Sequence, residues 1–174
     1  MRGFTIRLET PGFGSDPEQY SEFVRNGLRD LTMANVWAYE HDPHLASLKE
    51  AGVEYRREPP GNEQFKDVVA VLRDGYGDCE DLACAQAAWR TVRTGELCSP
   101  FITWKALGAG RWLYHITVLR ADGTREDPSR ELGMNHEPGE WKLRGALWVY
   151  EMLPGRHGVT PKPVPALTTK ERAA

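Results

Sequence analysis

One cysteine lies where a glycine-rich turn is predicted to become a helix, in the stretch Gly75-Tyr76-Gly77-Asp78-Cys79-Glu80-Asp81-Leu82-Ala83. The two glycines allow a sharp turn and the close approach of a substrate. Asp78 is a good helix N-cap, and Asp81 follows at the spacing of a capping box. Cys79 then falls in the first helical turn, where unpaired N–H groups and the helix dipole favour a thiolate. Because the thiolate is the attacking species, this turn is a candidate nucleophilic site.

A structural interpretation of the same cysteine is also open. Cysteine is among the most buried residue types, and Cys84, five positions further along the same helix, is predicted to be a small core residue. Glu80 and Asp81 oppose ionisation of the Cys79 thiol, since like charge raises a thiol pKa. A nucleophilic Cys79 therefore needs a base or a cation from elsewhere in the fold.

His115 is the candidate base, because it lies in a predicted central strand over residues 112–118, where histidine is unusual. The alternative is a core histidine bonded to a backbone carbonyl, or a strand residue that faces solvent. Asp127 ends the strand that returns from the next hairpin and is the candidate group that orients the base.

The hairpin loop decides whether Asp127 can meet His115. A two-residue turn at 122–123 places Asp127 on the face away from His115, and Glu126 is then the substitute orienting group. A three-residue loop over 121–123 places Asp127 on the same face as His115. Gly123 suits the left-handed residue that such a loop prefers.

A metal centre is the less favoured use of these residues. A zinc site would have to combine Cys79, Cys84, Cys98 and His115, which show no CxxC or HxxxH spacing. The chain also carries no phosphate-binding glycine motif. We therefore expect neither a metal nor another cofactor.

Composition restricts the classes of protein that need to be considered. The chain has 174 residues, a formal net charge of −3 and no basic excess that would indicate nucleic-acid binding. No apolar run is long enough to span a membrane, and residues 1–6 lack the apolar core of a secretion signal. Three cysteines form no disulfide framework. We expect a cytoplasmic protein at synthesis, although a phage particle needs no signal peptide and would be an exception.

The predicted elements indicate an α+β fold. An alanine-rich helix from Cys79 to about Thr94, stopped by Gly95, is expected to pack closely on a sheet. Other helices are predicted from Asp16-Pro17 to about Tyr39, from Asp42-Pro43 to Gly52, and over 63–73. Strands are predicted over 4–8, 53–57, 101–107, 112–120, 124–127 and 147–152.

One domain is predicted over residues 1–153, with its core over about 63–152 and a proline-rich basic tail over 154–174. The tail holds four of the twelve prolines and four basic residues against one acidic residue. It is typical of a mobile or extended segment. The alternative is an arm that docks on a partner.

The combination of motifs resembles the transglutaminase-like superfamily of cysteine proteins. The resemblance rests on residues 77–83, on His115 in a strand, and on Asp127-Pro128-Ser129 after a hairpin, and it covers about 63–134. It implies a transglutaminase-like or papain-like core: a nucleophile helix packed on an antiparallel sheet, here with additional N-terminal helices. The chain is also similar to small transglutaminase-like proteins of tailed phages, through residues 55–59, 75–79 and 127–134.

The resemblance implies a Cys-His-Asp thiol hydrolase or acyltransferase that acts on a peptide or glutamine amide through a thioester. Cys79 is then the nucleophile, His115 the base and Asp127 the orienting group. Tyr76, Gly77 and Asp78 are candidates for contact with the substrate or the oxyanion. The alternative is a non-enzymatic component of a phage virion or tail, with the tail over 154–174 contacting phage structural proteins.

Overall fold

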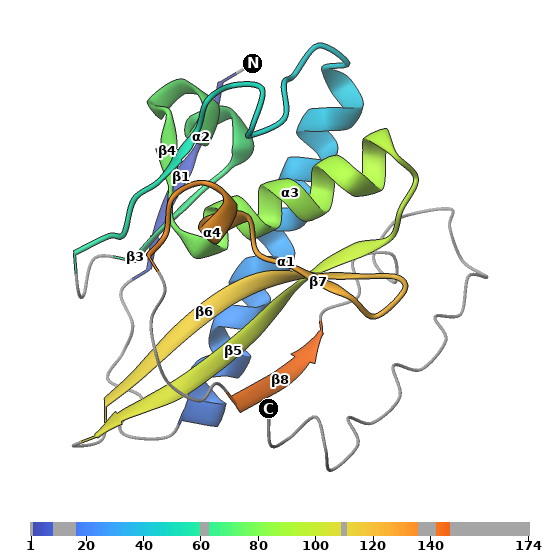
Figure 1. The fold of residues 1–174 in the computed structure, drawn as a ribbon. Helices are drawn as coiled ribbons and strands as arrows, with labels where there is room; N and C mark the ends of the chain where they lie inside the picture. Colours follow the sequence, from blue (N-terminus) through green and yellow to red (C-terminus); the bar gives the residue numbers. More distant parts are fainter. Residues whose placement is uncertain (1, 9–16, 60–62, 109–110, 136–141, 147–174) are drawn as a thin grey trace.

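The computed structural model describes residues 2–8, 17–59, 63–108, 111–135 and 142–146, and these form a mixed α+β fold (Figure 1). In chain order the elements are β1 (Thr5–Leu8), α1 (Pro17–His41), β2 (Glu54–Tyr55), β3 (Glu63–Lys66), α2 (Val68–Asp74), β4 (Tyr76–Gly77), α3 (Cys79–Arg93), β5 (Cys98–Gly108), β6 (Arg111–Arg120), β7 (Arg125–Glu126), α4 (Pro128–Glu131) and β8 (Lys142–Ala146).

The strands form three small sheets. The largest is antiparallel, with strand order β7-β6-β5-β8. The strands β1 and β3 form an antiparallel pair, and β2 pairs with β4 in parallel. Figure 1 shows the long helix α1 passing behind the β5–β6 ribbon, with α3 beside it.

One hydrophobic cluster joins α1, α3 and the four-stranded sheet. The alanines of α3 let this helix approach both partners closely, as the sequence predicted. The buried members of this cluster include Val24, Leu28 and Leu31 of α1, Ala83, Cys84 and Ala87 of α3, and Ile102, Ile116 and Val118 of the sheet. A second cluster packs the other side of α3 against α2 and the end of α1, and includes Val36, Tyr39, Val68, Val71, Leu82 and Ala88.

The single helix predicted over 63–73 is wrong. Residues 63–66 form β3, in which Lys66 pairs with Thr5 of β1, and α2 begins only at Val68. Asp67 separates the two elements, because its extended backbone and a 2.8 Å hydrogen bond from the Ala70 N–H cap the helix.

The helix predicted from Asp42 to Gly52 is also wrong, since these residues form turns. The Asp42 carboxylate accepts the N–H of His44 at 3.0 Å, so it stabilises a local turn. Ser47 and Glu50 then bond to one another, with the Ser47 hydroxyl 2.8 Å from Oε2 of Glu50, and this closes a single turn. The left-handed Gly52, at φ 66°, ends it.

Other local predictions are confirmed. α1 begins at Pro17, and α3 ends at Arg93 before the left-handed Gly95 at φ 72°. β8 was not predicted, and the strand predicted over 147–152 and the tail over 154–174 lie outside the described residues. Among the helices that the structure describes, none combines the length and the apolar character needed to cross a membrane.

Candidate active site

Cys79 begins α3 directly after a turn that two glycines make possible. Gly75 is left-handed, at φ 76°, and its N–H closes α2 on the carbonyl of Val71. A Cβ at position 77 would come within 2.9 Å of the Asp81 Cβ, so Gly77 is needed for the close approach of α3 itself. The turn is confirmed, and Gly77 serves this packing contact in addition to any approach of a substrate.

The predicted capping box at the start of α3 is wrong. Asp78 is the N-cap residue, but its side chain makes no capping hydrogen bond. Asp81 points to β3, where its Oδ1 accepts the main-chain N–H of Lys66 at 2.7 Å. Asp81 therefore accepts the main-chain N–H of Lys66 on β3, instead of a main-chain N–H at the start of α3 as a capping box would require.

Lys66 supplies a buried positive charge beneath this turn. Its Nζ lies 3.7 Å from Oδ2 of Asp81 and donates to the carbonyl of Tyr76 at 3.2 Å. It also lies 3.9 Å from the centre of the Tyr76 ring, and the Arg56 guanidinium lies 4.0 Å from the same ring. These contacts hold the backbone and ring of Tyr76, three residues before the candidate nucleophile. The sequence did not indicate a role for Lys66 in the site, because residues 63–73 were predicted to form one helix.

The Cys79 thiol is held as a neutral group in this arrangement. Its Sγ donates to Oε2 of Glu80 at 3.2 Å. Burial raises the pKa of the Cys79 thiol well above its ordinary value, the negative charges of Glu80 and Asp78 raise it further, and the Ile116 N–H lowers it. The expectation that the helix N-terminus favours a thiolate is therefore wrong here, because burial and two carboxylates outweigh the helix dipole.

His115 and Asp127 lie in direct contact. Nε2 of His115, a buried residue of β6, is 2.8 Å from Oδ2 of Asp127. Burial raises the pKa of Asp127, but its hydrogen bond and charge interaction with His115 outweigh burial and lower it. A carboxylate only accepts hydrogen bonds, so Nε2 carries the proton. In the neutral imidazole, Nδ1 is then the nitrogen that can take a proton from a thiol.

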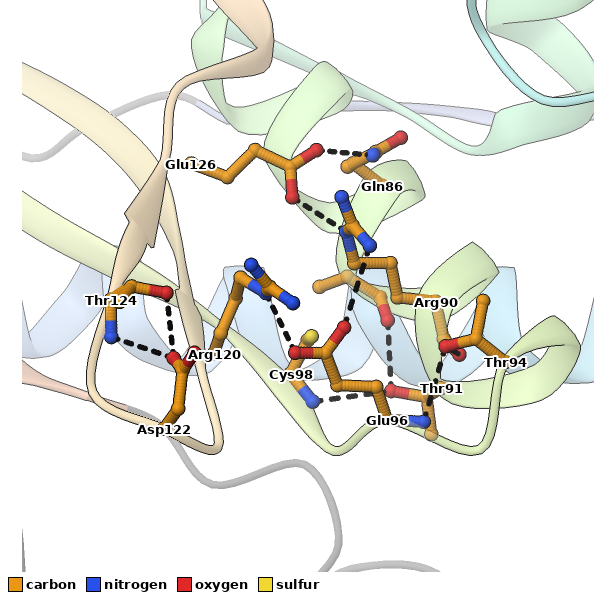
Figure 2. Close-up of polar contacts among 11 residues, drawn as sticks. Gln86, Arg90, Thr91, Thr94, Glu96, Cys98, Arg120, Asp122, Thr124 and Glu126 are labelled. Atoms are coloured by element: carbon orange, nitrogen blue, oxygen red, sulfur yellow. Dashed lines mark hydrogen bonds and ion pairs between the residues drawn. The ribbon is translucent and has the colours of Figure 1, made fainter.

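The hairpin loop has the three-residue form that this contact requires. Val118 pairs with Glu126 and Leu119 with Arg125. Gly123 is left-handed, at φ 85°, and its N–H bonds the Arg120 carbonyl at 3.0 Å. Asp122 accepts both the N–H and the hydroxyl of Thr124, which closes the loop (Figure 2). The register that places Asp127 on the face of His115 is confirmed.

Asp127 is fixed by a second role as the N-cap of α4. Its Oδ1 accepts the Arg130 N–H at 3.2 Å, and Nε of Arg130 lies 3.1 Å from Oδ2. Oδ1 thus accepts the helix N–H, while Oδ2 contacts both His115 and the side chain of Arg130. Glu126, the substitute orienting group, turns to α3 and bonds Gln86 and Arg90.

The described site brings the cysteine beside the strand that carries the histidine. The Ile116 N–H, which lowers the pKa of the Cys79 thiol, belongs to the residue after His115. The thiol proton, however, is directed to Glu80. Proton transfer to His115 therefore requires the Cys79 side chain to turn away from Glu80.

The other two cysteines lie in different surroundings. Cys84 is fully buried in the α1–α3 cluster, with its Sγ 3.5 Å from the Leu28 carbonyl, as predicted for a core residue. Cys98 is buried at the start of β5. Within the part of the chain that the structure describes, no group of three or more His, Cys, Asp or Glu side chains could hold a metal ion.

Tyr55 is a neighbour of the thiol that sequence reasoning missed. It is half-buried on β2, and burial raises its pKa most; negative charge on Cys79 when the thiol ionises, and on Asp78, raises it further. β2 pairs with β4, which places Tyr55 opposite Gly77. A two-residue parallel pairing leaves no periodic pattern in the sequence, so no signal pointed to this contact.

Replacing Glu80 with glutamine is expected to speed alkylation of Cys79 by iodoacetamide roughly tenfold at neutral pH, because it removes the carboxylate charge beside the thiol. The pKa of the thiol falls, so the rate profile should move to lower pH. Peptide mass spectrometry would measure the rate at Cys79, and the exposed Glu54→Gln provides the same change of charge as a control. An unchanged Glu80→Gln profile would contradict the assigned contact.

Comparisons with protein-family models, with curated protein sequences and with solved structures found no match to this chain. The chemical interpretation of Cys79, His115 and Asp127 therefore rests on the contacts of these side chains and on the elements that carry them.

Proposed function

We propose that this chain is a thiol hydrolase or acyltransferase with a transglutaminase-like core, acting on a peptide or glutamine amide. The observation that carries the proposal is the 2.8 Å contact between His115 Nε2 and Asp127 Oδ2, on a sheet packed against the helix that begins at Cys79. Nucleophilic catalysis requires a base that is oriented by a carboxylate, and His115 has this orientation and precedes Ile116, whose N–H lowers the pKa of the Cys79 thiol.

In the proposed reaction, Nδ1 of His115 takes the proton of the Cys79 thiol as sulfur attacks the carbonyl carbon of the amide. The main-chain N–H of Cys79 is the candidate donor to the oxyanion. His115 then gives its proton to the departing amine or ammonia, which leaves a thioester on Cys79. Water attacks the thioester with His115 again as base, and the carboxylic acid and the thiol are released. An amine in place of water would give a new amide.

The raised thiol pKa means that Cys79 enters the reaction as a protonated thiol. Because Glu80 and Asp78 oppose the thiolate, proton transfer to His115 has to accompany the attack. Asp127 contributes by stabilising the imidazolium that forms, since its carboxylate remains bonded to Nε2. Hydrolysis is favoured over cross-linking, because water is always present.

The second candidate function is structural, as a virion or tail component that uses the same fold as a scaffold. The observation in its favour is the Cys79–Glu80 contact, which keeps the thiol protonated. Fold alone does not decide between the two functions. The decisive difference is whether a thioester forms on Cys79 and turns over.

The test uses p-nitrophenyl acetate as a generic acyl donor. We expect transient acetylation of Cys79, seen by peptide mass spectrometry, and continued release of p-nitrophenol. Cys79→Ala should lose both signals, and Cys84→Ala, which removes a thiol from the core, should retain them. A fluorescent primary amine offered with a glutamine-containing protein would then separate transfer from hydrolysis. Absence of acetyl-Cys79, or an acetyl group that is never released, would favour the scaffold function.

A further inference from the structure

A polar network ties the short strand β7 to helix α3, next to the residue that contacts His115 (Figure 2). Oε1 of Glu126 accepts from Gln86 Nε2, and Oε2 accepts from Arg90 Nε, both at 2.5 Å. The Glu126 side chain is only 9% exposed, so water contributes little to its solvation. We call Gln86, Arg90 and Glu126 the β7 clamp.

The network continues to the other strand of the hairpin. Nη1 of Arg90 lies 3.4 Å from Oε2 of Glu96, and Oε1 of Glu96 lies 2.6 Å from Nε of Arg120. Arg120 is the last residue of β6. Charges therefore alternate from β7 through α3 to β6, and Figure 2 shows them following one another along the side of α3.

β7 needs such support because it is only two residues long. Two residue pairs join it to β6, and this is little pairing for a strand that must fix the next residue. Consecutive residues of an extended chain point in opposite directions. Glu126 points to α3, while Asp127 contacts His115 on the other side. Fixing one side chain therefore fixes the backbone that aims the other.

The energetics favour a geometric role for the clamp. The Arg90–Glu126 ion pair is partly buried, and such a pair is seldom more stabilising than apolar side chains of similar volume, because both charges lose hydration. Leu or Met at 90 and 126 would supply stability equally well. The ion pair additionally fixes the relative orientation of the two side chains, because a guanidinium and a carboxylate bind one another in few orientations.

We propose that the β7 clamp is a positioning device that holds Asp127 against Nε2 of His115. The clamp matters for catalysis only if the proposed function holds. The positioning of Asp127 is a property of the folded chain and can be measured without catalysis. Gln86, Arg90 and Glu126 are thus positioning residues, and they act through the backbone of β7.

The test replaces the ion pair by apolar side chains in the double variant Arg90→Met/Glu126→Met, which is expected to fold. The readout is the exchange of the His115 Nε2 proton with water, measured by NMR on ¹⁵N-histidine protein. We expect exchange to accelerate at least about tenfold, as for the loss of a charge-assisted hydrogen bond. The fraction of His115 in the Nε2–H tautomer should fall as well, while the melting temperature changes little.

Two further variants make the result specific. Arg120→Met removes an ion pair from the same hairpin but leaves Glu126 bonded to α3, so His115 should exchange as in the wild type. Glu126→Gln keeps acceptor and donor atoms at the clamp and should give a partial effect. It also replaces the double variant if that protein does not fold. Wild-type exchange and tautomer in a folded clamp variant would overturn the proposal.

The readout separates this proposal from the proposed function. Faster exchange in the clamp variant of a protein that never acetylates Cys79 would support positioning and reject catalysis. Acetylation of Cys79 at the wild-type rate and unchanged exchange in the clamp variant would support catalysis and reject positioning.

Discussion

Replacing His115 with alanine is expected to slow acetylation of Cys79 by p-nitrophenyl acetate by about 10²–10⁴-fold, the usual contribution of a positioned general base. The neutral thiol depends on this base, because burial, Glu80 and Asp78 all oppose a free thiolate. Stopped-flow release of p-nitrophenol, together with the mass of the Cys79 peptide, would measure the effect. His41→Ala, which removes an exposed histidine at the end of α1, is the matched control.

The Asp127→Asn variant tests whether Asp127 orients the imidazole of His115, because the imidazole itself is still present in this variant. The carboxylate offers one oxygen to the Arg130 N–H and the other to His115, whereas an amide has a single oxygen for both donors. We therefore expect a loss smaller than that of His115→Ala, with the start of α4 retained. Acetylation at the wild-type rate in His115→Ala would reject His115 as the base, whatever the result for Asp127→Asn.

The parts of the site that could be predicted depend on local signals. The start of α3 follows from the glycines before it, although Asp78 makes no side-chain cap, and the hairpin register follows from a left-handed Gly123 in a three-residue loop. The short helix α4 was not predicted, although Asp127-Pro128 has the N-cap and N1 residues typical of a helix start. Together these local rules bring His115 and Asp127 into contact without knowledge of the rest of the fold.

The parts that escaped prediction depend on residues distant in the sequence. β3 forms because residues 63–66 pair with β1 at the N-terminus of the chain, and no local pattern distinguishes this strand from the first turn of a helix. The capping box failed for the same reason, since Asp81 bonds a donor on β3. The thiolate prediction failed because partial burial, and in addition the charges of Glu80 and Asp78, raise the thiol pKa, and that burial depends on residues distant in the sequence.

The ion pair between Lys66 and Asp81 lies beneath the site, and its loss is expected to have the largest effect on stability. Asp81 is fully buried, and it accepts the Lys66 N–H at 2.7 Å while its second oxygen lies 3.7 Å from the Lys66 ammonium. Burial, followed by the charge of Asp78, holds the pKa of Asp81 well above its ordinary value, although the N–H and the ammonium of Lys66 act in the opposite direction. Asp81 and Lys66 therefore depend on one another for their solvation inside the protein.

Asp81→Ala is expected to lower the free energy of unfolding by about 3–5 kcal/mol, because it leaves a buried ammonium without its carboxylate. The side chain of Lys66 is 5% exposed, so water cannot easily replace the lost partner. Asp81→Asn keeps an acceptor for the Lys66 N–H and should cost less. Urea denaturation followed by circular dichroism would measure both variants. A cost below about 1 kcal/mol for Asp81→Ala would mean that Lys66 reaches solvent, and that the contacts fixing Tyr76 before Cys79 are weaker than their geometry indicates.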